Sequence, residues 1–439
     1  MKIMTLGEHM SRKRKALKNI SVGMGKRTLG SMKIAAKTGI AVVRHSAHEK
    51  SHERWERVSD EMSRMKGLMM KVGQMASYIE GALPPEAQPF LQRLQSQSDP
   101  LEFTAVQAAI ETAFDDTFPN LYDSFEQSPI AAASIGQVHR AQYNQSPVAV
   151  KVQYPQIKTA ITNDLSSLSR VSQLGLLITP GGGKDILKEL KERFLEECDY
   201  EREASYLRAF HTIISDIPGA HLPSVIPERS CGTVLTMTFE EGMDFETFCA
   251  EASPTARNRA ATILSTFVWN SVFKHGLFNA DPHPGNYLFQ PDGTCTFLDF
   301  GCVKQFDENR MSQWKAFARS ILENNRASFE QTSRDMGFVG REKHFNWDDY
   351  WRLLRYLYEP FTEPDFVYTT EYVQKAYAMH QKNINLRGNV LPGDMVFTNR
   401  LQWGFNSVLT QLGGQADWKS IFYNAVYAPF TPIDIPCDT

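Results

Sequence analysis

Three polar residues in one short stretch could carry out metal-dependent chemistry on phosphates: Asp281, Asn286 and Asp299. The turn signal Pro291-Asp292-Gly293 lies between two runs of strand-forming residues, which predicts a hairpin with strands over 287–290 and 294–298. Asn286 and Asp299 would then emerge side by side at its open end. A carboxylate and an amide oxygen suit a hard divalent ion such as Mg²⁺. Asp281 precedes Asn286 in a loop stiffened by two prolines, and can face the ion or the incoming nucleophile.

The order of these residues matches that of protein kinases, in which D-x-x-x-x-N is followed by D-F-G. Upstream, Val148-Ala149-Val150-Lys151 has the pattern of the kinase strand whose lysine reaches nucleotide phosphates. Glu197 is the expected partner of Lys151, because it falls on the apolar stripe of a predicted helix over 186–210. A carboxylate there is costly unless a cation pairs with it. The predicted catalytic residues are therefore Asp281, Lys151 and Glu197, and the predicted metal ligands are Asn286 and Asp299.

Kinases place a glycine-rich phosphate loop before the lysine strand, and this chain has alanines there. Alanine restricts the backbone and hinders its approach to phosphates, so only Gly136 keeps full conformational freedom. The chain also lacks H-R-D and A-P-E sequences, which puts phosphorylation of protein substrates in doubt. The predicted phosphate loop comprises Ala131, Ala132, Ala133, Ser134 and Gly136.

The elements that must position these residues form an α+β pattern. Apolar periodicity predicts helices from 51 to about 81 and over 87–94, 105–114 and 158–177, and strand patterns cover 130–141, 148–152, 222–227 and 233–239. Beyond Gly242 we expect helices, with the hairpin as the exception. The pattern predicts a small sheet in the first lobe and a mostly helical second lobe.

Composition favours a globular protein. The chain has 439 residues and is 42% hydrophobic, with no apolar run long enough to span a membrane. Its six cysteines lack metal-ligand spacing, which is typical of a reduced intracellular compartment. Residues 1–45 hold 11 of the 47 Lys and Arg and one of the 50 acids. This basic tail is either a solvated segment or a peripheral contact with an anionic membrane surface; nucleic acid is not expected.

The chain resembles the UbiB/AarF atypical kinase family, a protein-kinase-like family associated with coenzyme Q biosynthesis. The resemblance rests on K-x-G-Q at 71–74, the alanine-rich loop, E-C-D-Y-x-x-E at 197–203, N-A-D-P-H-P-G-N at 279–286 and L-D-F-G at 298–301. It implies a two-lobed kinase-like fold that binds ATP and Mg²⁺ and supports ubiquinone or other prenyl-lipid metabolism. It further implies that Lys71 and Gln74 reach the nucleotide pocket and that Glu203 ties the K-x-G-Q helices to it.

Four regions are expected: a basic tail over 1–50, a helical K-x-G-Q extension over 51–118, a first lobe with a helical insertion over 119–240, and a helical second lobe over 241–439. The first functional hypothesis is an atypical kinase or ATPase, cytoplasmic or peripheral to a membrane. The second is a nucleotide-responsive scaffold that binds prenyl-lipid or quinone intermediates, or quinone-biosynthesis proteins, with little turnover. A small-molecule kinase of the aminoglycoside or choline type is a third, against which the K-x-G-Q segment argues.

Overall fold

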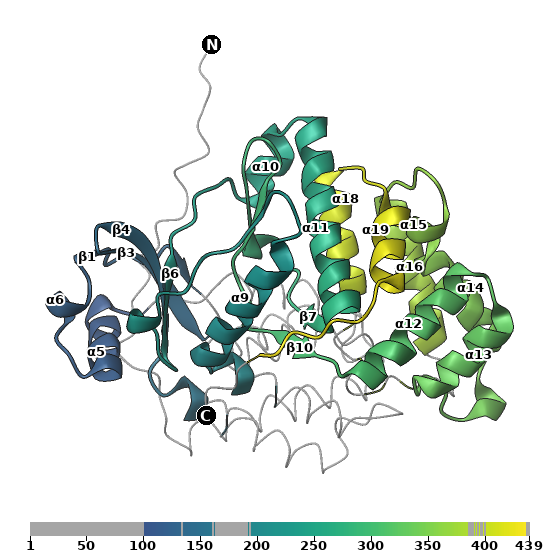
Figure 1. The fold of residues 1–439 in the computed structure, drawn as a ribbon, viewed down its shortest axis with the longest axis horizontal. Coiled ribbons are helices and arrows are strands. Elements are labelled where there is room, and N and C mark those ends of the chain that lie inside the picture. Colours follow the sequence, from purple (N-terminus) through teal and green to yellow (C-terminus); the bar gives the residue numbers. More distant parts are fainter. Residues whose placement is uncertain are drawn as a thin grey trace, which may run out of the picture.

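The computed structural model describes residues 101–132, 135–159, 162, 192, 195–384, 390, 392, 395, 398 and 401–435. These residues form a sheet-containing lobe at one end and a larger helical lobe at the other (Figure 1). The predicted α+β class and two-lobed kinase-like architecture are confirmed. The basic tail, residues 51–100 of the expected K-x-G-Q extension and most of the predicted 158–177 helix lie outside the described residues.

The first lobe is built on a five-stranded antiparallel sheet. Its order is β1 (Ser124–Phe125), β3 (Gly136–Tyr143), β4 (Ser146–Gln153) and β6 (Val234–Thr238), with β2 (Ala131–Ala132) also paired to β3. Helix α5 (Phe103–Phe114) packs against β4 on one side, and α9 (Tyr200–Ile214) lies between the sheet and the helical lobe (Figure 1). Two short helical turns, α6 (Phe118–Leu121) and η3 (Pro227–Arg229), border the sheet.

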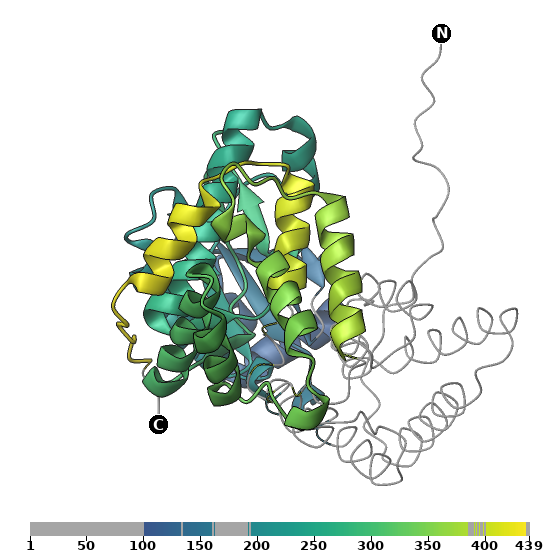
Figure 2. The same ribbon diagram turned by 90° about the vertical axis from the view of Figure 1, so that its right-hand side faces the viewer.

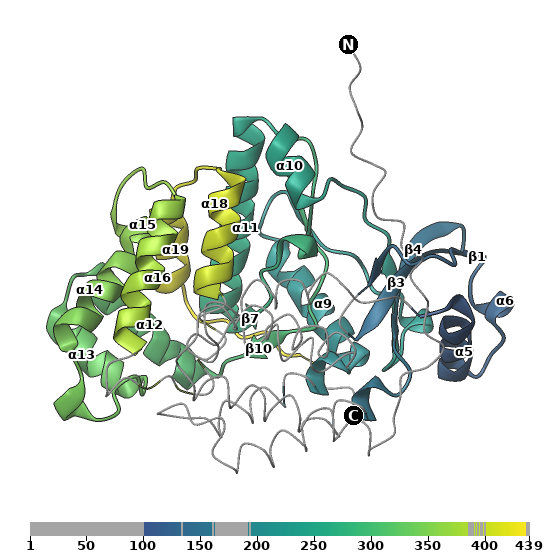
Figure 3. The ribbon, with the colours of Figure 1, turned by 180° about the vertical axis from the view of Figure 1, so that it is seen from behind.

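The second lobe is organised around the long helix α11 (Pro254–His275). Ser253 caps its first turn by accepting a hydrogen bond from the Ala256 amide, and Gly276 ends it in a left-handed conformation. Helices α18 and α19 run beside α11, and α12 to α16 extend the lobe outward (Figures 2 and 3). The remaining helices and helical turns are α10 (Phe245–Glu251), η4 (Pro284–Asn286), α12 (Glu308–Leu322), α13 (Arg326–Asp335), η5 (Glu342–His344), α14 (Trp347–Leu357), α15 (Glu359–Thr362), α16 (Thr370–Ile384), the π-helical turn η7 (Leu401–Phe405), α18 (Asn406–Leu412) and α19 (Trp418–Tyr427).

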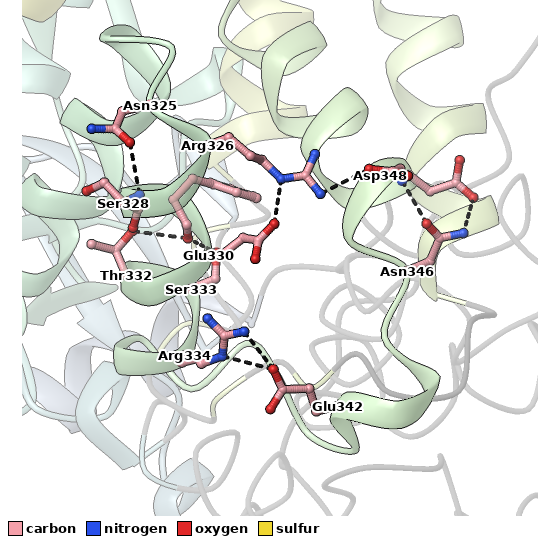
Figure 4. Close-up of polar contacts among 12 residues, drawn as sticks. Asn325, Arg326, Ser328, Glu330, Thr332, Ser333, Arg334, Glu342, Asn346 and Asp348 are labelled. Atoms are coloured by element: carbon pink, nitrogen blue, oxygen red, sulfur yellow. Dashed lines mark hydrogen bonds and ion pairs between the residues drawn. The ribbon is translucent and has the colours of Figure 1, made fainter.

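Polar contacts join α13 to α14 at the outer end of the helical lobe (Figure 4). Arg326 bonds Glu330 one turn along its own helix and also reaches Asp348 of α14. Asn325 caps α13 by accepting from the Ser328 amide. Because these side chains are partly to largely exposed, each ion pair is worth at most about 1 kcal/mol.

Besides the sheet of the first lobe, the described residues form two small sheets, one of three strands and one of two. The hairpin of β8 (Tyr287–Phe289) and β9 (Cys295–Phe297) confirms the predicted one, and Gln290 and Thr294 close it around the predicted turn. Strand β5 (Ala220–His221) adds to β9 in parallel, and β7 (Leu277–Asn279) pairs with β10 (Val303–Gln305). We expected the chain beyond Gly242 to be helical apart from this hairpin, and the pairing of β7 with β10 shows that this expectation was wrong.

Two other predicted elements need correction. The expected strand over 222–227 contributes one isolated bridge, from Val225 to Met237, before Pro227 starts a helical turn. The expected strand over 130–141 is divided into β2 and β3, and β3 begins at Gly136. The predicted helix over 105–114 and the lysine strand over 148–152 are confirmed within α5 and β4.

Candidate functional site

Lys151 occupies β4, and its side chain points toward α9. Its ammonium donates hydrogen bonds to both carboxylate oxygens of Glu203, at 2.7 and 2.9 Å. It also lies 3.6 Å from Asp299 Oδ2. The Lys151 residue is only 8% exposed and Glu203 only 3%, so this contact is a buried ion pair. The sheet lysine and the D-F-G aspartate thus meet at one point between the lobes.

The partner of Lys151 differs from the one expected. The sequence pattern predicted Glu197, on a single helix running through residue 210. Instead the chain turns at Cys198 and Asp199, and Asp199 starts α9 by accepting a hydrogen bond from the Arg202 amide. The new helix therefore carries Glu203 toward Lys151. Glu197 is buried and close enough to Glu203 for its charge to affect that carboxyl group.

Burial and neighbouring charges shift the pKa values of both members of this pair. Burial lowers the pKa of Lys151, but the carboxylates of Asp299 and Glu203 outweigh this effect and hold the pKa well above its usual value. Burial also raises the pKa of Glu203 to about 7, against the opposing effect of the Lys151 ammonium. Lys151 therefore stays charged, while Glu203 titrates near neutral pH.

The hairpin brings the two predicted metal ligands together. The Leu298 amide donates to the Asn286 carbonyl at 3.0 Å, so Asn286 and Asp299 leave adjacent strand ends. The Asn286 side-chain nitrogen donates a hydrogen bond to the Asp281 carbonyl at 3.0 Å. The side-chain oxygen of Asn286 can therefore coordinate a metal ion. One carboxylate oxygen of Asp299 accepts from the Gly301 amide, and the other faces Lys151.

Asn279 is a positioning residue that sequence reasoning did not assign. Its side-chain nitrogen donates to the Asp299 carbonyl at 2.9 Å, and its side-chain oxygen accepts from the Asp281 amide at 3.2 Å. Pairing of β7 with β10 places Asn279 opposite Val303, just after the D-F-G segment. Its location two residues before Asp281 was the available signal, although the cross-link depends on a strand pair that the sequence did not reveal.

The predicted phosphate loop is only partly described. Ala131 and Ala132 are exposed in β2, whereas Ala133 and Ser134 lie outside the described residues. Gly136 was expected to supply backbone freedom, but the structure gives another reason for glycine. A Cβ at this position would collide with the Val152 carbonyl and lie 2.7 Å from the Tyr200 hydroxyl. Glycine thus permits close packing between β3, β4 and α9.

Lys71 and Gln74 also lie outside the described residues, so their predicted reach into the pocket stays a prediction. The donor set does fit a hard divalent cation. The Asp299 carboxylate and the Asn286 amide supply oxygen atoms, and the Asp299 side chain is 37% exposed, so a phosphate-bound ion could share it. Among the described residues, no helix is long and apolar enough to cross a bilayer.

A sheet lysine paired with a helix glutamate, and a D-F-G aspartate beside the Asn286 loop, define the class: this is a protein-kinase-like domain. Residues 93–333 match the family of ABC1 atypical kinase-like domains, which is more than half of the chain. The chain therefore belongs to the ABC1 atypical kinase-like family, also called UbiB/AarF, as its motifs suggested.

Several curated proteins are similar to this chain. "Atypical kinase COQ8, mitochondrial" of Saccharomyces cerevisiae is 26% identical over 342 residues, covering 76% of this chain and 66% of the relative. The Caenorhabditis elegans protein of the same description is 28% identical over 292 residues, covering 65% and 38%. "Protein ACTIVITY OF BC1 COMPLEX KINASE 3, chloroplastic" of Arabidopsis thaliana is 32% identical over 254 residues, covering 56% and 35%. The chain thus spans between 35% and 66% of the length of these relatives.

One similar solved structure is that of the Mycobacterium tuberculosis protein Rv3197 in complex with erythromycin. It has a TM-score of 0.60 and 27% sequence identity, and the match covers 88% of this chain and 99% of that one. The two proteins therefore share a fold.

Proposed function

We propose that this protein is an atypical kinase or ATPase that binds Mg-ATP between its lobes and supports ubiquinone or other prenyl-lipid metabolism. The observation that carries the proposal is the contact of Lys151 with both Glu203 and Asp299. It joins the phosphate-binding lysine of one lobe to the metal-binding carboxylate of the other. No structural role requires three buried or half-buried charges to meet there, because an apolar cluster of similar volume would be at least as stable.

In this proposal each residue has a separate task. Lys151 holds nucleotide phosphates, and Glu203 keeps the ammonium in place. Asp281 orients the attacking water or hydroxyl group, and the Asn279 cross-link holds the Asp281 backbone against Asp299. Asn286 and Asp299 would hold Mg²⁺, which when bound would neutralise charge on the phosphate oxygens. The rate enhancement is then mainly electrostatic and positional.

The metabolic part of the proposal rests on the relatives. COQ8 proteins are described as atypical kinases, and the sequence motifs of this chain resemble the coenzyme Q biosynthesis-associated family. Prenyl-lipid or quinone intermediates and quinone-biosynthesis proteins are therefore the proposed partners, with peripheral membrane contact through the basic segment.

A second candidate is a nucleotide-responsive scaffold with little turnover. Ala131 and Ala132 favour it, because their side chains occupy the strand where kinases use glycine to approach phosphates closely. Mg-ATP would raise the free energy of unfolding of such a protein, because it binds the folded state only, but no phosphate would be released.

The test compares wild type with Asp299→Asn and with Asp335→Asn, the same change on the outer helix α13. Mg-ATP binding is measured by calorimetry, and phosphate release is measured with and without ubiquinone-containing vesicles. We expect Asp299→Asn to lower hydrolysis by about 100-fold or more, because it removes the charged carboxylate that would hold Mg²⁺ against the phosphates, and Asp335→Asn to match wild type. Equal hydrolysis by wild type and Asp299→Asn would remove the enzyme proposal, and binding without hydrolysis by wild type would favour the scaffold.

A further inference from the structure

Two buried polar groups near Lys151 lack hydrogen-bond partners among the described residues: the Tyr200 hydroxyl and the Gln153 side-chain nitrogen. Tyr200 is 1% exposed and Gln153 is 6% exposed. An unsatisfied buried polar group costs about 1–3 kcal/mol. Two such groups beside a proposed nucleotide site are therefore expensive in the free protein.

Sheet register places these groups together. Gly136 is directly opposite Gln153, and Val138 is opposite Lys151. Opposed residues in an antiparallel pair share a face, and residues two apart on one strand share it too. Gln153, Lys151 and the missing side chain of Gly136 thus lie on the face that α9 covers. The Tyr200 hydroxyl lies 2.7 Å from where a Gly136 Cβ would be.

The chemistry of the group predicts its missing partner. The Lys151 ammonium lies 5.2 Å from the centre of the Tyr200 ring, within range of a cation–π contact. Burial raises the pKa of Tyr200, so its hydroxyl keeps its proton. The Gln153 nitrogen is a donor as well. The Tyr200 hydroxyl and the Gln153 nitrogen are thus two unsatisfied donors beside the Lys151 cation. An anion with several acceptor oxygens is the ligand that would satisfy them.

We propose that Tyr200 and Gln153 are phosphate-binding residues that donate hydrogen bonds to oxygen atoms of bound ATP beside Lys151. This inference rests on the proposed nucleotide site and adds two residues to it. Binding requires a small local shift that uncovers the two donor atoms, because both are buried in the free protein. Their unsatisfied state lowers the net cost of that shift, since the bound state restores both hydrogen bonds.

The test uses Tyr200→Phe and Gln153→Met, which keep size and shape but remove the donors. Ser265→Ala is the matched control, because the Ser265 hydroxyl on α11 is also buried and without a partner in the described part of the chain. Thermal unfolding of the free proteins and calorimetric binding of Mg-ATP and of adenosine are measured for all four proteins. Adenosine has the base and sugar but no phosphate, so it separates phosphate contacts from general damage to the pocket.

We expect each site variant to bind Mg-ATP about 10-fold to 100-fold more weakly, the usual effect of losing a hydrogen bond to a charged group. Adenosine binding and free-protein stability should be unchanged or improved, and Ser265→Ala should bind both ligands as wild type does. Wild-type Mg-ATP affinity in both site variants would overturn the inference while leaving the proposed function intact, and so would an equal loss for adenosine. Absence of Mg-ATP binding by wild type would instead overturn the proposed function and this inference with it.

Discussion

Phe300 of the D-F-G segment packs against Phe210 of α9, with ring centroids 4.6 Å apart. Both side chains are almost completely buried, and Phe267 of α11 contacts both rings. Because Phe210 and Glu203 share a helix, this contact connects the residue that holds Lys151 to the residue that follows Asp299. The aromatic cluster thus sets the distance between the two halves of the site.

Separate Phe210→Leu and Phe300→Leu substitutions should each destabilise the protein, and their effects should not be additive. The aromatic pair contributes about 0.5–1.5 kcal/mol beyond the area it buries, so the double variant should lose less than the sum of the two by that amount. Chemical denaturation of the four proteins measures this coupling. The control is a second double-mutant cycle that combines Phe210→Leu with Phe329→Leu, a change of a buried ring on α13, and its effects should be additive. An equal coupling energy in the two cycles would contradict the prediction.

Lys151→Met should give a stability loss that depends on pH. The Glu203 carboxyl, already raised to a pKa of about 7, loses its cation and rises further. The folded protein then binds a proton at pH values where the unfolded chain, whose glutamate has the ordinary pKa of 4.5, does not. The contribution of Glu203 to the free energy of unfolding is therefore fully present below the unfolded pKa and is lost as pH rises through the folded pKa.

Urea unfolding of Lys151→Met at pH 6 and pH 8.5 tests this sign. The free energy of unfolding of Lys151→Met should fall below that of wild type by more at pH 8.5 than at pH 6. At pH 8.5 the difference should reach about 3–5 kcal/mol, the usual cost of leaving a buried charge unpaired. Lys151→Met combined with Glu203→Gln should show no such dependence. A deficit that grows as pH falls would show that Glu203 is not the titrating group.

Asn279→Ala should slow turnover much more than it weakens nucleotide binding. It removes two hydrogen bonds that hold the Asp281 and Asp299 backbones together, and at about 1 kcal/mol each the rate should fall about 30-fold. Asn279→Asp keeps the acceptor for the Asp281 amide but sets a carboxylate oxygen against the Asp299 carbonyl, so it should not restore turnover. Steady-state hydrolysis and Mg-ATP calorimetry separate the two effects, and a parallel loss in both would argue for general damage instead.

A buried chain of hydrogen bonds should make the first lobe sensitive to acid. The Leu101 amide donates to Gln137, whose side-chain nitrogen contacts His139 Nε2, and His139 Nδ1 contacts the Glu126 carbonyl. This arrangement requires a neutral imidazole that donates from Nδ1. Burial lowers the pKa of His139, against opposing effects of the Glu126 carbonyl and carboxylate.

Because the folded pKa of His139 is depressed, its contribution is present above the unfolded value of 6.5 and is lost as pH falls through the folded pKa. His139→Phe keeps an aromatic ring beside Phe125 but cannot titrate. Urea midpoints at pH 7.5 and pH 5.5 should decrease more with acid in wild type than in His139→Phe. Identical slopes would assign the acid sensitivity to other groups.

Local patterns predicted the parts of the site that depend on one short segment. The hairpin followed from its turn residues and flanking strands, and it brought Asn286 and Asp299 together as expected. Likewise, the V-A-V-K pattern located β4 and its buried lysine. In both cases the residues that form the feature are close in sequence, so turn chemistry and alternation were sufficient.

Features that depend on helix phase or distant pairing were not predicted. Asp199 is a capping residue that interrupts the expected helix, and that interruption exchanges Glu197 for Glu203 as the partner of Lys151. The pairing of β7 with β10 joins segments more than twenty residues apart and was invisible to periodicity. An aspartate before a run of helix-forming residues was the one local signal that could have corrected the helix start.

The hairpin that carries Asn286 and Asp299 is anchored to the helical lobe at its turn. Its turn lies on the first turn of α11, where Arg259 pairs with Asp292 and a side chain at Gly293 would collide with the Ala256 carbonyl. The separation of the two proposed metal ligands is consequently built into the helical lobe alone. The spacing of these two oxygen atoms therefore does not depend on how the sheet lobe packs against the helical lobe.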